Sequence, residues 1–198
     1  MDVNKAIENL RRKGFKVTYF ETGAEAAEYI CQGCAGHSVG IGGMKTALDI
    51  GLIEKLHKVS EVYSLSAGRT PEGYKKAAEA DIYLTSANAI SETGEIINID
   101  GFGNRVSSTL FGHEKVYIVA GVNKLEPDIP SAMHRARNIA APLNARRLGK
   151  NTPCAKSDEL KCYDCSSPER ICRAFVITER PMRGADNEVV LINESLGF

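Results

Sequence analysis

The chain has 198 residues, of which 43% are hydrophobic and 25% are charged, the composition of an ordinary globular protein. A chain of this length can bury roughly 70% of the surface that it exposes when unfolded, so a core can form without disulfide bonds or metal ions. Its 25 basic residues balance 25 acidic ones, and a net charge of zero argues against a general nucleic-acid-binding protein and against a protein of the membrane surface.

We expect a single domain over residues 1–198, because a typical domain has about 150 residues. No apolar run approaches the roughly 18 residues of a transmembrane helix, so no membrane insertion is expected. The first residues, MDVNKAIENLRRKGFKV, are amphipathic and lack the apolar stretch of a signal peptide. We therefore expect a cytoplasmic protein, in which the six cysteines do not form a disulfide scaffold.

Helices and strands alternate over the first 85 residues. The apolar periodicity predicts helices over residues 2–13, 22–30, 44–57 and 70–80, and strands over 16–20, 38–41, 62–65 and 82–85. Gly14 ends the first helix. Thr22 and Glu25 form a capping box for the second helix. Thr70, followed by a proline, marks the start of the fourth.

The second half of the chain is less regular. We expect a loop over 87–94, a strand over 95–100, a glycine-rich turn over 101–104, a strand over 115–120, a helix over 128–148, a cysteine-rich loop over 151–173, and strands over 174–178 and 188–193. Pro142 should bend or break the long helix, because a proline inside a helix removes a hydrogen bond and clashes with the preceding turn.

Strands that alternate with crossover helices predict an α/β fold, a Rossmann-like sandwich in which helices cover both faces of a mostly parallel sheet. In such sheets, ligands bind outside the carboxyl ends of the strands. Three of these ends carry glycine or polar residues, at 42–43, 86–88 and 121–124. We therefore expect the ligand site at this edge of the sheet.

Four cysteines fall close together in the cysteine-rich loop, in the pattern Cys154-x7-Cys162-x2-Cys165-x6-Cys172. The loop has little apolar content with which to order itself, and four thiolates around a metal centre would order it. Zinc and iron–sulfur clusters both take four cysteines, but the spacing matches neither the common ferredoxin patterns nor the paired CxxC of a zinc ribbon. An iron–sulfur cluster is the favoured interpretation, and zinc and free or disulfide-forming thiols are the alternatives.

A second pair, Cys31-x2-Cys34, follows the helix predicted over 22–30. A CxxC pair near a strand–helix unit can be a redox motif, which depends on a thiol at a helix N-terminus. This pair lies at a C-terminal end, where the helix dipole disfavours a thiolate. Two small buried residues are therefore the favoured interpretation, with a metal or redox role as the alternative.

Two polar or glycine-rich segments follow predicted strands. Gly42 and Gly43 would let backbone amides approach an anion at the start of the next helix, although a tight turn without a ligand explains the same pattern. In the segment ANAISETG, Asn88 is suited to orient a carbonyl or carboxylate, and Glu92 to act as a base or nucleophile. From the residues alone, a plain hairpin turn is the favoured interpretation of this segment, and the site roles of Asn88 and Glu92 are the alternative.

Residues 131–150 contain five basic residues and no acidic ones. Arg135 and Arg146 are eleven positions apart, so three helical turns place them on one face. Such a face is suited to bind a carboxylate or phosphate, which makes Arg146 a candidate substrate-binding residue. A solvated face, or helix ends that face carboxylates, is nevertheless the commoner explanation of such a pattern.

Five further stretches form a recognisable set: GIGGM with TALDIGL, ANAISETGEIINIDGFGNRV, VYIVAGVNKL, RNIAAPLNARRL, and TPCA with the cysteines that follow it. Together they resemble the LUD (lactate-utilisation) domain family over essentially the whole chain. The resemblance implies the fold of the phosphosugar-isomerase and coenzyme A-transferase superfamily. It also implies a part in the bacterial oxidation of L-lactate to pyruvate by an iron–sulfur-containing complex, with other lactate-utilisation subunits as partners.

The resemblance further implies a pocket at the carboxyl ends of three strands. Its residues would be Gly42, Gly43 and Met44, then Asn88, Ser91, Glu92 and Thr93, and then Asn123 and Lys124. Superfamily transferases place a glutamate nucleophile near the strand ends, and Glu92 is the nearest candidate in this chain. The long ferredoxin-like segment of larger LUD proteins is missing, and the loop from Cys154 to Cys172 is a smaller arrangement.

Three functions follow from these observations. The first is a LUD-type protein that binds a small organic anion and assists a redox step through an iron–sulfur centre held by the four loop cysteines. The second is a transferase or isomerase that acts on a coenzyme A ester or sugar phosphate through Glu92 and needs no metal. The third is a non-catalytic assembly or regulatory subunit with structural zinc. The sequence leaves open the substrate, the reaction and the formation of a homo-oligomer.

Overall fold

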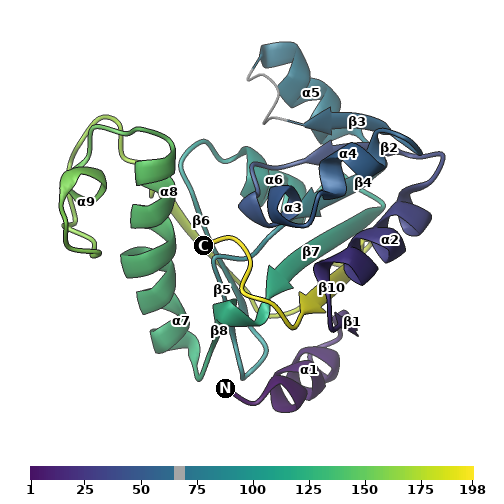
Figure 1. Cartoon of the computed structure of the whole chain (residues 1–198), viewed down its shortest axis with the longest axis horizontal. Helices are drawn as coiled ribbons and strands as arrows, with labels where there is room; N and C mark the ends of the chain where they lie inside the picture. Colours follow the sequence, from purple (N-terminus) through teal and green to yellow (C-terminus); the bar gives the residue numbers. More distant parts are fainter. Residues whose placement is uncertain (65–69) are drawn as a thin grey trace.

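The computed structural model describes residues 1–64 and 70–198, and its centre is a sheet of six parallel strands (Figure 1). The strands are β1 (Lys16–Phe20), β2 (Ser38–Ile41), β3 (Glu61–Ser64), β4 (Ile82–Thr85), β7 (Lys115–Gly121) and β10 (Asp186–Ile192). Their order is β1-β10-β7-β4-β2-β3, and every neighbouring pair is parallel. The predicted parallel sheet is confirmed. Leu65, expected at the end of the third strand, lies outside the described residues.

Helices cover both faces of this sheet, as the alternation of helix and strand predicted. Successive residues of β7 point to opposite faces, so Tyr117 and Val119 join one core and Val116 and Ile118 join the other. The helices on the first face are α2 (Gly23–Cys34), α3 (Lys45–Asp49) and α4 (Leu52–Leu56). The helix α1 (Val3–Arg12) packs on the opposite face, with Val116 and Ile118. The helices α5 (Pro71–Glu79) and α6 (Asn104–Leu110) also contact strands of this sheet.

A second, smaller sheet lies between the parallel sheet and the long helix of the C-terminal half (Figure 1). Its strands, in the order β8-β5-β6-β9, are β8 (Leu125–Glu126), β5 (Ala89–Ser91), β6 (Ile96–Asp100) and β9 (Ala174–Thr178). Ile90 and Ile96 pack toward the parallel sheet, whereas Ala89 and Ile97 pack toward the helix. The prediction of a loop over 87–94 was therefore wrong at β5, because both faces of this short strand are buried.

The long helix consists of α7 (Ile129–Arg135), a π-helical turn (Ala136–Ala140) and α8 (Ala141–Arg147) without interruption. Pro142 does not break it. The wider π turn immediately before the proline relieves the clash with the preceding carbonyl that a regular α-helix would produce. Among residues 1–64 and 70–198, no helix is long and apolar enough to cross a membrane.

Three helices differ from the predictions in other ways. Gly51 adopts a φ of 63°, which divides the helix expected over 44–57 into α3 and α4. The short helix α6 follows the glycine-rich turn and was not predicted. The helix expected to end near residue 30 continues as α2 to Cys34, so Cys31 and Cys34 lie in its last turn. Both thiols are buried, and burial raises the pKa of Cys34 to about 12. These observations favour the interpretation of Cys31 and Cys34 as small core residues over a metal or redox role.

Candidate functional site

The carboxyl ends of the parallel strands meet at one edge of the sheet, where the residues that follow β2, β4 and β7 come together. The Gly42 amide donates to the Leu84 carbonyl at 3.0 Å, which ties the end of β2 to β4. Lys124, after β7, donates from Nζ to Ser86 Oγ at 2.8 Å. The side chains and turns predicted at three strand ends therefore lie at one common edge.

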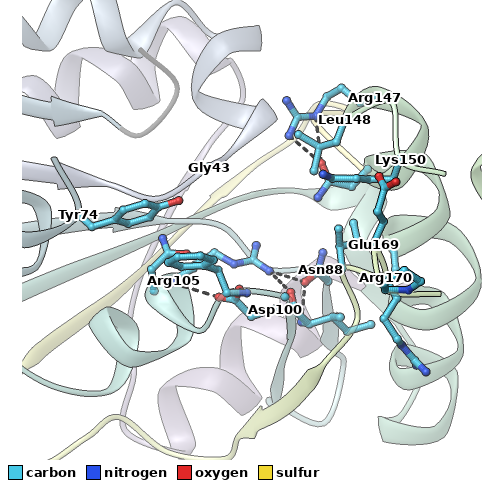
Figure 2. A pocket seen from close by; sticks show the side chains of 18 residues that line it. Gly43, Tyr74, Asn88, Asp100, Arg105, Arg147, Leu148, Lys150, Glu169 and Arg170 are labelled. Carbon is cyan, nitrogen blue, oxygen red and sulfur yellow. Dashed lines mark hydrogen bonds between the residues drawn. The ribbon is translucent and has the colours of Figure 1, made fainter. Parts of the chain in front are cut away.

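A cavity of about 360 Å³ opens at this edge, between the sheet and α8 with the cysteine loop (Figure 2). Gly43 and Asn88, both predicted as substrate-binding residues, line it. The charged residues that line it are Asp100, Arg105, Arg147, Lys150, Glu169 and Arg170. Because four of these are basic and two are acidic, we call this cavity the anion pocket.

Asp100 stabilises the turn beneath the anion pocket. Its carboxylate accepts the backbone amides of Phe102, Gly103, Arg105 and Val106, at distances between 2.9 and 3.1 Å. Burial on its own would raise the pKa of Asp100, but these donors and the Arg105 guanidinium hold the pKa below its ordinary value. The negative charge of Asp100 is therefore bound by the amides of the turn. The basic side chains are then the dominant charges of the pocket.

Arg105 and Asn88 form one wall of the anion pocket. Nη2 of Arg105 donates to Asn88 Oδ1 at 2.9 Å and to the carbonyl of Ile99. The backbone amide of Ile99 donates to the same Asn88 oxygen at 2.8 Å, so Asn88 orients the guanidinium (Figure 2). Sequence reasoning missed Arg105, although it belongs to the stretch ANAISETGEIINIDGFGNRV, one of the five on which the family resemblance rests.

Lys124 lies at the same edge but beneath the chain's last residues. Its Nζ donates to Thr46 Oγ1 at 3.1 Å and to Ser86 Oγ at 2.8 Å, and only 2% of the residue is exposed. Burial, followed by the nearby charges of Arg135 and Arg105, lowers the pKa of Lys124 to about 7. A Cβ at Gly197 would lie 3.1 Å from Nζ, so the C-terminal segment covers this amine, and Lys124 does not line the anion pocket.

Three further predicted residues, Asn123, Met44 and Arg146, do not line the anion pocket. Asn123 Oδ1 accepts the backbone amide of Leu196 at 3.0 Å and so fastens the C-terminal segment. Met44 is buried in the core at the start of α3. Arg146 donates Nε to the Cys154 carbonyl at 3.3 Å, and its Nη2 reaches two further carbonyls of the cysteine loop. Arg146 therefore orders that loop. Arg135, the other arginine of the predicted basic face, donates to the carbonyls of Asn123 and Asn88.

Ser91, Glu92 and Thr93 lie at the opposite end of β5 from Asn88. Glu92 Oε1 is 2.6 Å from Lys5 Nζ, and Oε2 accepts the Asp2 amide at 3.1 Å. The hydrogen bond from Lys5 is the main reason that the pKa of Glu92 is lowered. Of the residues that the structure describes, this group does not line the anion pocket. The contacts are those of a hairpin turn packed against α1, and a catalytic role for Glu92 stays a prediction.

The four loop cysteines line one small cavity of about 20 Å³, which we call the cysteine cavity. All four are free and half-buried. Arg170 organises the backbone around them, because Nη1 donates to the Cys165 carbonyl at 2.6 Å and Nε to the Cys172 carbonyl at 3.2 Å. Contact with the Cys172 thiol also raises the pKa of Arg170. The four cysteines that are close together in the sequence therefore also lie around one cavity.

The donor set suits a four-thiolate group with charge compensation. Arg137 and Arg170 line the cysteine cavity and would offset the negative charge of thiolates. In the described part of the chain, no group of three or more His, Cys, Asp or Glu side chains could hold a single metal ion as the side chains lie. Tetrahedral zinc requires all four sulfurs about 2.3 Å from one ion. The thiolates of an iron–sulfur cluster bind different iron atoms and stand farther apart.

The anion pocket and the cysteine cavity share a wall. Ala141, Arg170 and Ile171 line both. Gly101 lets the Ile171 backbone come this close to the pocket floor, because a Cβ at Gly101 would lie 2.6 Å from the Ile171 carbonyl oxygen. The anion pocket and the cysteine cavity are therefore adjacent, and the backbone of Ile171 is part of the wall between them.

Comparison with known proteins identifies the family. A family model of the LUD domain matches residues 3–192. The chain belongs to the LUD domain family. A crystal structure of a DUF162-family protein from Deinococcus radiodurans has the same fold as this LUD-domain protein, with a TM-score of 0.55 and 12% sequence identity, covering 97% of this chain and 96% of that one. No curated protein matches the chain in sequence.

Proposed function

We propose that this LUD-domain protein, as part of lactate utilisation, binds a small organic anion in the anion pocket and assists a redox step through an iron–sulfur cluster held by Cys154, Cys162, Cys165 and Cys172. The observation that carries the proposal is the wall of Ala141, Arg170 and Ile171 that the two cavities share. A bound anion and a cluster would lie on the two faces of this wall.

The charges of the anion pocket support the first part of the proposal. Arg105 is held by Asn88, and Lys150 and Arg147 come from the end of the long helix, so two separate elements supply the positive charge. Guanidinium groups bind carboxylates through two parallel hydrogen bonds. L-lactate is therefore a suitable first ligand for this pocket.

The arrangement of the thiols supports the second part. Four free cysteines line one cavity together with two arginines, and four cysteine thiolates are the ligand set of an iron–sulfur cluster. An iron–sulfur cluster supplies one-electron transfer when it is bound. Oxidation of lactate to pyruvate releases two electrons and two protons, so the proposal also requires a further electron acceptor, for which other lactate-utilisation subunits are suited.

The cluster is tested on protein purified without oxygen. We expect iron and labile sulfide in similar amounts, with broad visible absorbance that bleaches on reduction. Cys162→Ser and Cys154→Ser should lose both metal and absorbance. Cys31→Ala, which removes a thiol from the core, should retain them. Zinc in place of iron would instead support the structural-zinc alternative, and absence of any metal would overturn this part of the proposal.

The anion pocket is tested separately by calorimetric titration of L-lactate. Lys150→Gln should weaken binding, because Lys150 lines the pocket, whereas Lys156→Gln removes an exposed charge that lines neither cavity and should leave binding unchanged. Equal affinities of the two variants would show that lactate does not bind in the anion pocket.

A further inference from the structure

A second, largely apolar cavity of about 910 Å³ lies beside the anion pocket, between α5 and α6. Ala77, Ala78 and Tyr83 line it, and Tyr74, Phe102 and Asn104 line both this cavity and the anion pocket. We call it the apolar cavity. The two cavities are therefore adjacent and meet at these three residues, of which Phe102 is exposed.

An aromatic pair stands where the two cavities meet. The rings of Tyr74 and Phe102 are stacked, with centroids 4.8 Å apart and an angle of 15° between their planes. Phe102 is 73% exposed and lies in none of the core clusters found among the described residues. An exposed, stacked aromatic pair at a cavity mouth is suited to bind the face of another ring.

We infer that the two cavities form one binding site, whose ligand is an anion that carries an aromatic ring. The anionic group binds Arg105 and Lys150 in the anion pocket, and the ring lies against Tyr74 and Phe102. This inference rests on the proposed function only in that both place the anionic group in the anion pocket. It adds that lactate fills only part of the site.

The test compares anions that differ by a ring. Titration calorimetry measures L-lactate against 3-phenyllactate for a carboxylate group, and inorganic phosphate against adenosine monophosphate for a phosphate group. We expect the ring-bearing member of at least one pair to bind about tenfold more tightly than its partner, because the ring is removed from water. The pair that shows the preference tells a carboxylate ligand from a phosphate ligand. Equal affinity within both pairs overturns the inference.

Variants locate the ring and separate the two proposals. Phe102→Ala and Tyr74→Ala should bring the affinity ratio of the ring-bearing to the ringless anion close to one. Phe111→Ala is the matched control, because Phe111 is 89% exposed and lines neither cavity, and it should keep the wild-type ratio. A ratio unchanged in Phe102→Ala overturns the inference while lactate binding stands. If neither lactate nor any other anion binds, the proposed function fails as well.

Discussion

The Arg105 guanidinium donates a 2.9 Å hydrogen bond to the carboxamide oxygen of Asn88, and this contact joins the loop after β4 to the first turn of α6. The same oxygen accepts the Ile99 amide at 2.8 Å. A single side chain thus fixes both a strand of the second sheet and a cation of the anion pocket, so stability and anion binding depend on it together.

Replacing Asn88 separates these two effects. Asn88→Ala leaves the Ile99 amide and Arg105 without this acceptor, so we expect the free energy of unfolding to fall by about 1–3 kcal/mol in urea denaturation. Asn88→Asp keeps an oxygen acceptor and should stay near wild-type stability, but its added negative charge should weaken lactate binding. Wild-type stability in Asn88→Ala would contradict the role assigned to this contact.

The two glycines after β2 should respond differently to substitution. In Gly42→Ala the new Cβ would lie 2.8 Å from Tyr83 Oη and 3.3 Å from Arg105 Cγ, so one of these side chains must move. We expect weaker anion binding in titration calorimetry. A Cβ at Gly43 meets no protein atom within 4 Å, but Gly43 lines the anion pocket, so its control measurement is stability. Gly43→Ala should keep the wild-type free energy of unfolding in urea denaturation, whereas Gly42→Ala should lower it. Equal stability of the two variants would refute this assignment.

Lys124 should make stability depend on pH in the alkaline range. Its pKa of about 7 in the folded chain lies below the value of about 10.4 for an unfolded lysine. Between these values the unfolded chain binds more protons, so stability rises with pH. Relative to Lys124→Met, wild type should gain up to about 1.4 kcal/mol per pH unit from about pH 7 to 10. Urea denaturation of both proteins at several pH values measures this, and a constant difference would exclude a neutral buried amine.

Arg146 should control the order of the cysteine loop. Its guanidinium contacts three carbonyls, those of Cys154, Ser157 and Glu159. In Arg146→Ala we expect limited proteolysis to cut residues 151–173 several times faster, because these contacts are lost. Lys156→Ala, an exposed change within the same loop, should be cut at the wild-type rate. Unchanged cleavage of Arg146→Ala would mean that other contacts order the loop.

The parallel sheet could be predicted because each of its strands is a short apolar run bounded by helix signals. The second sheet could not. β5 has three residues within a polar segment, and Ile90 is buried only because β6 and the parallel sheet enclose it. Local periodicity carries no information about such a strand.

The candidate site was predicted in part. Gly43 and Asn88 were found because they follow strands whose ends share an edge, and the four cysteines because they are close in sequence. Arg105, Lys150 and Arg170 reach the anion pocket from three separate elements, so only the tertiary fold reveals that they act together. Ser91, Glu92 and Thr93 follow the same strand as Asn88 in sequence, but β5 carries them away from the edge.

The wall of Ala141, Arg170 and Ile171 has a thermodynamic consequence. Arg170 holds the carbonyls of Cys165 and Cys172 while its side chain borders the anion pocket, so one side chain contacts both cavities. Linkage is reciprocal: if oxidation of the thiols changes anion affinity by some factor, a bound anion shifts the midpoint potential of the thiols by the corresponding free energy. The redox state of the thiols would then depend on the cellular anion concentration as well as on the cellular redox potential.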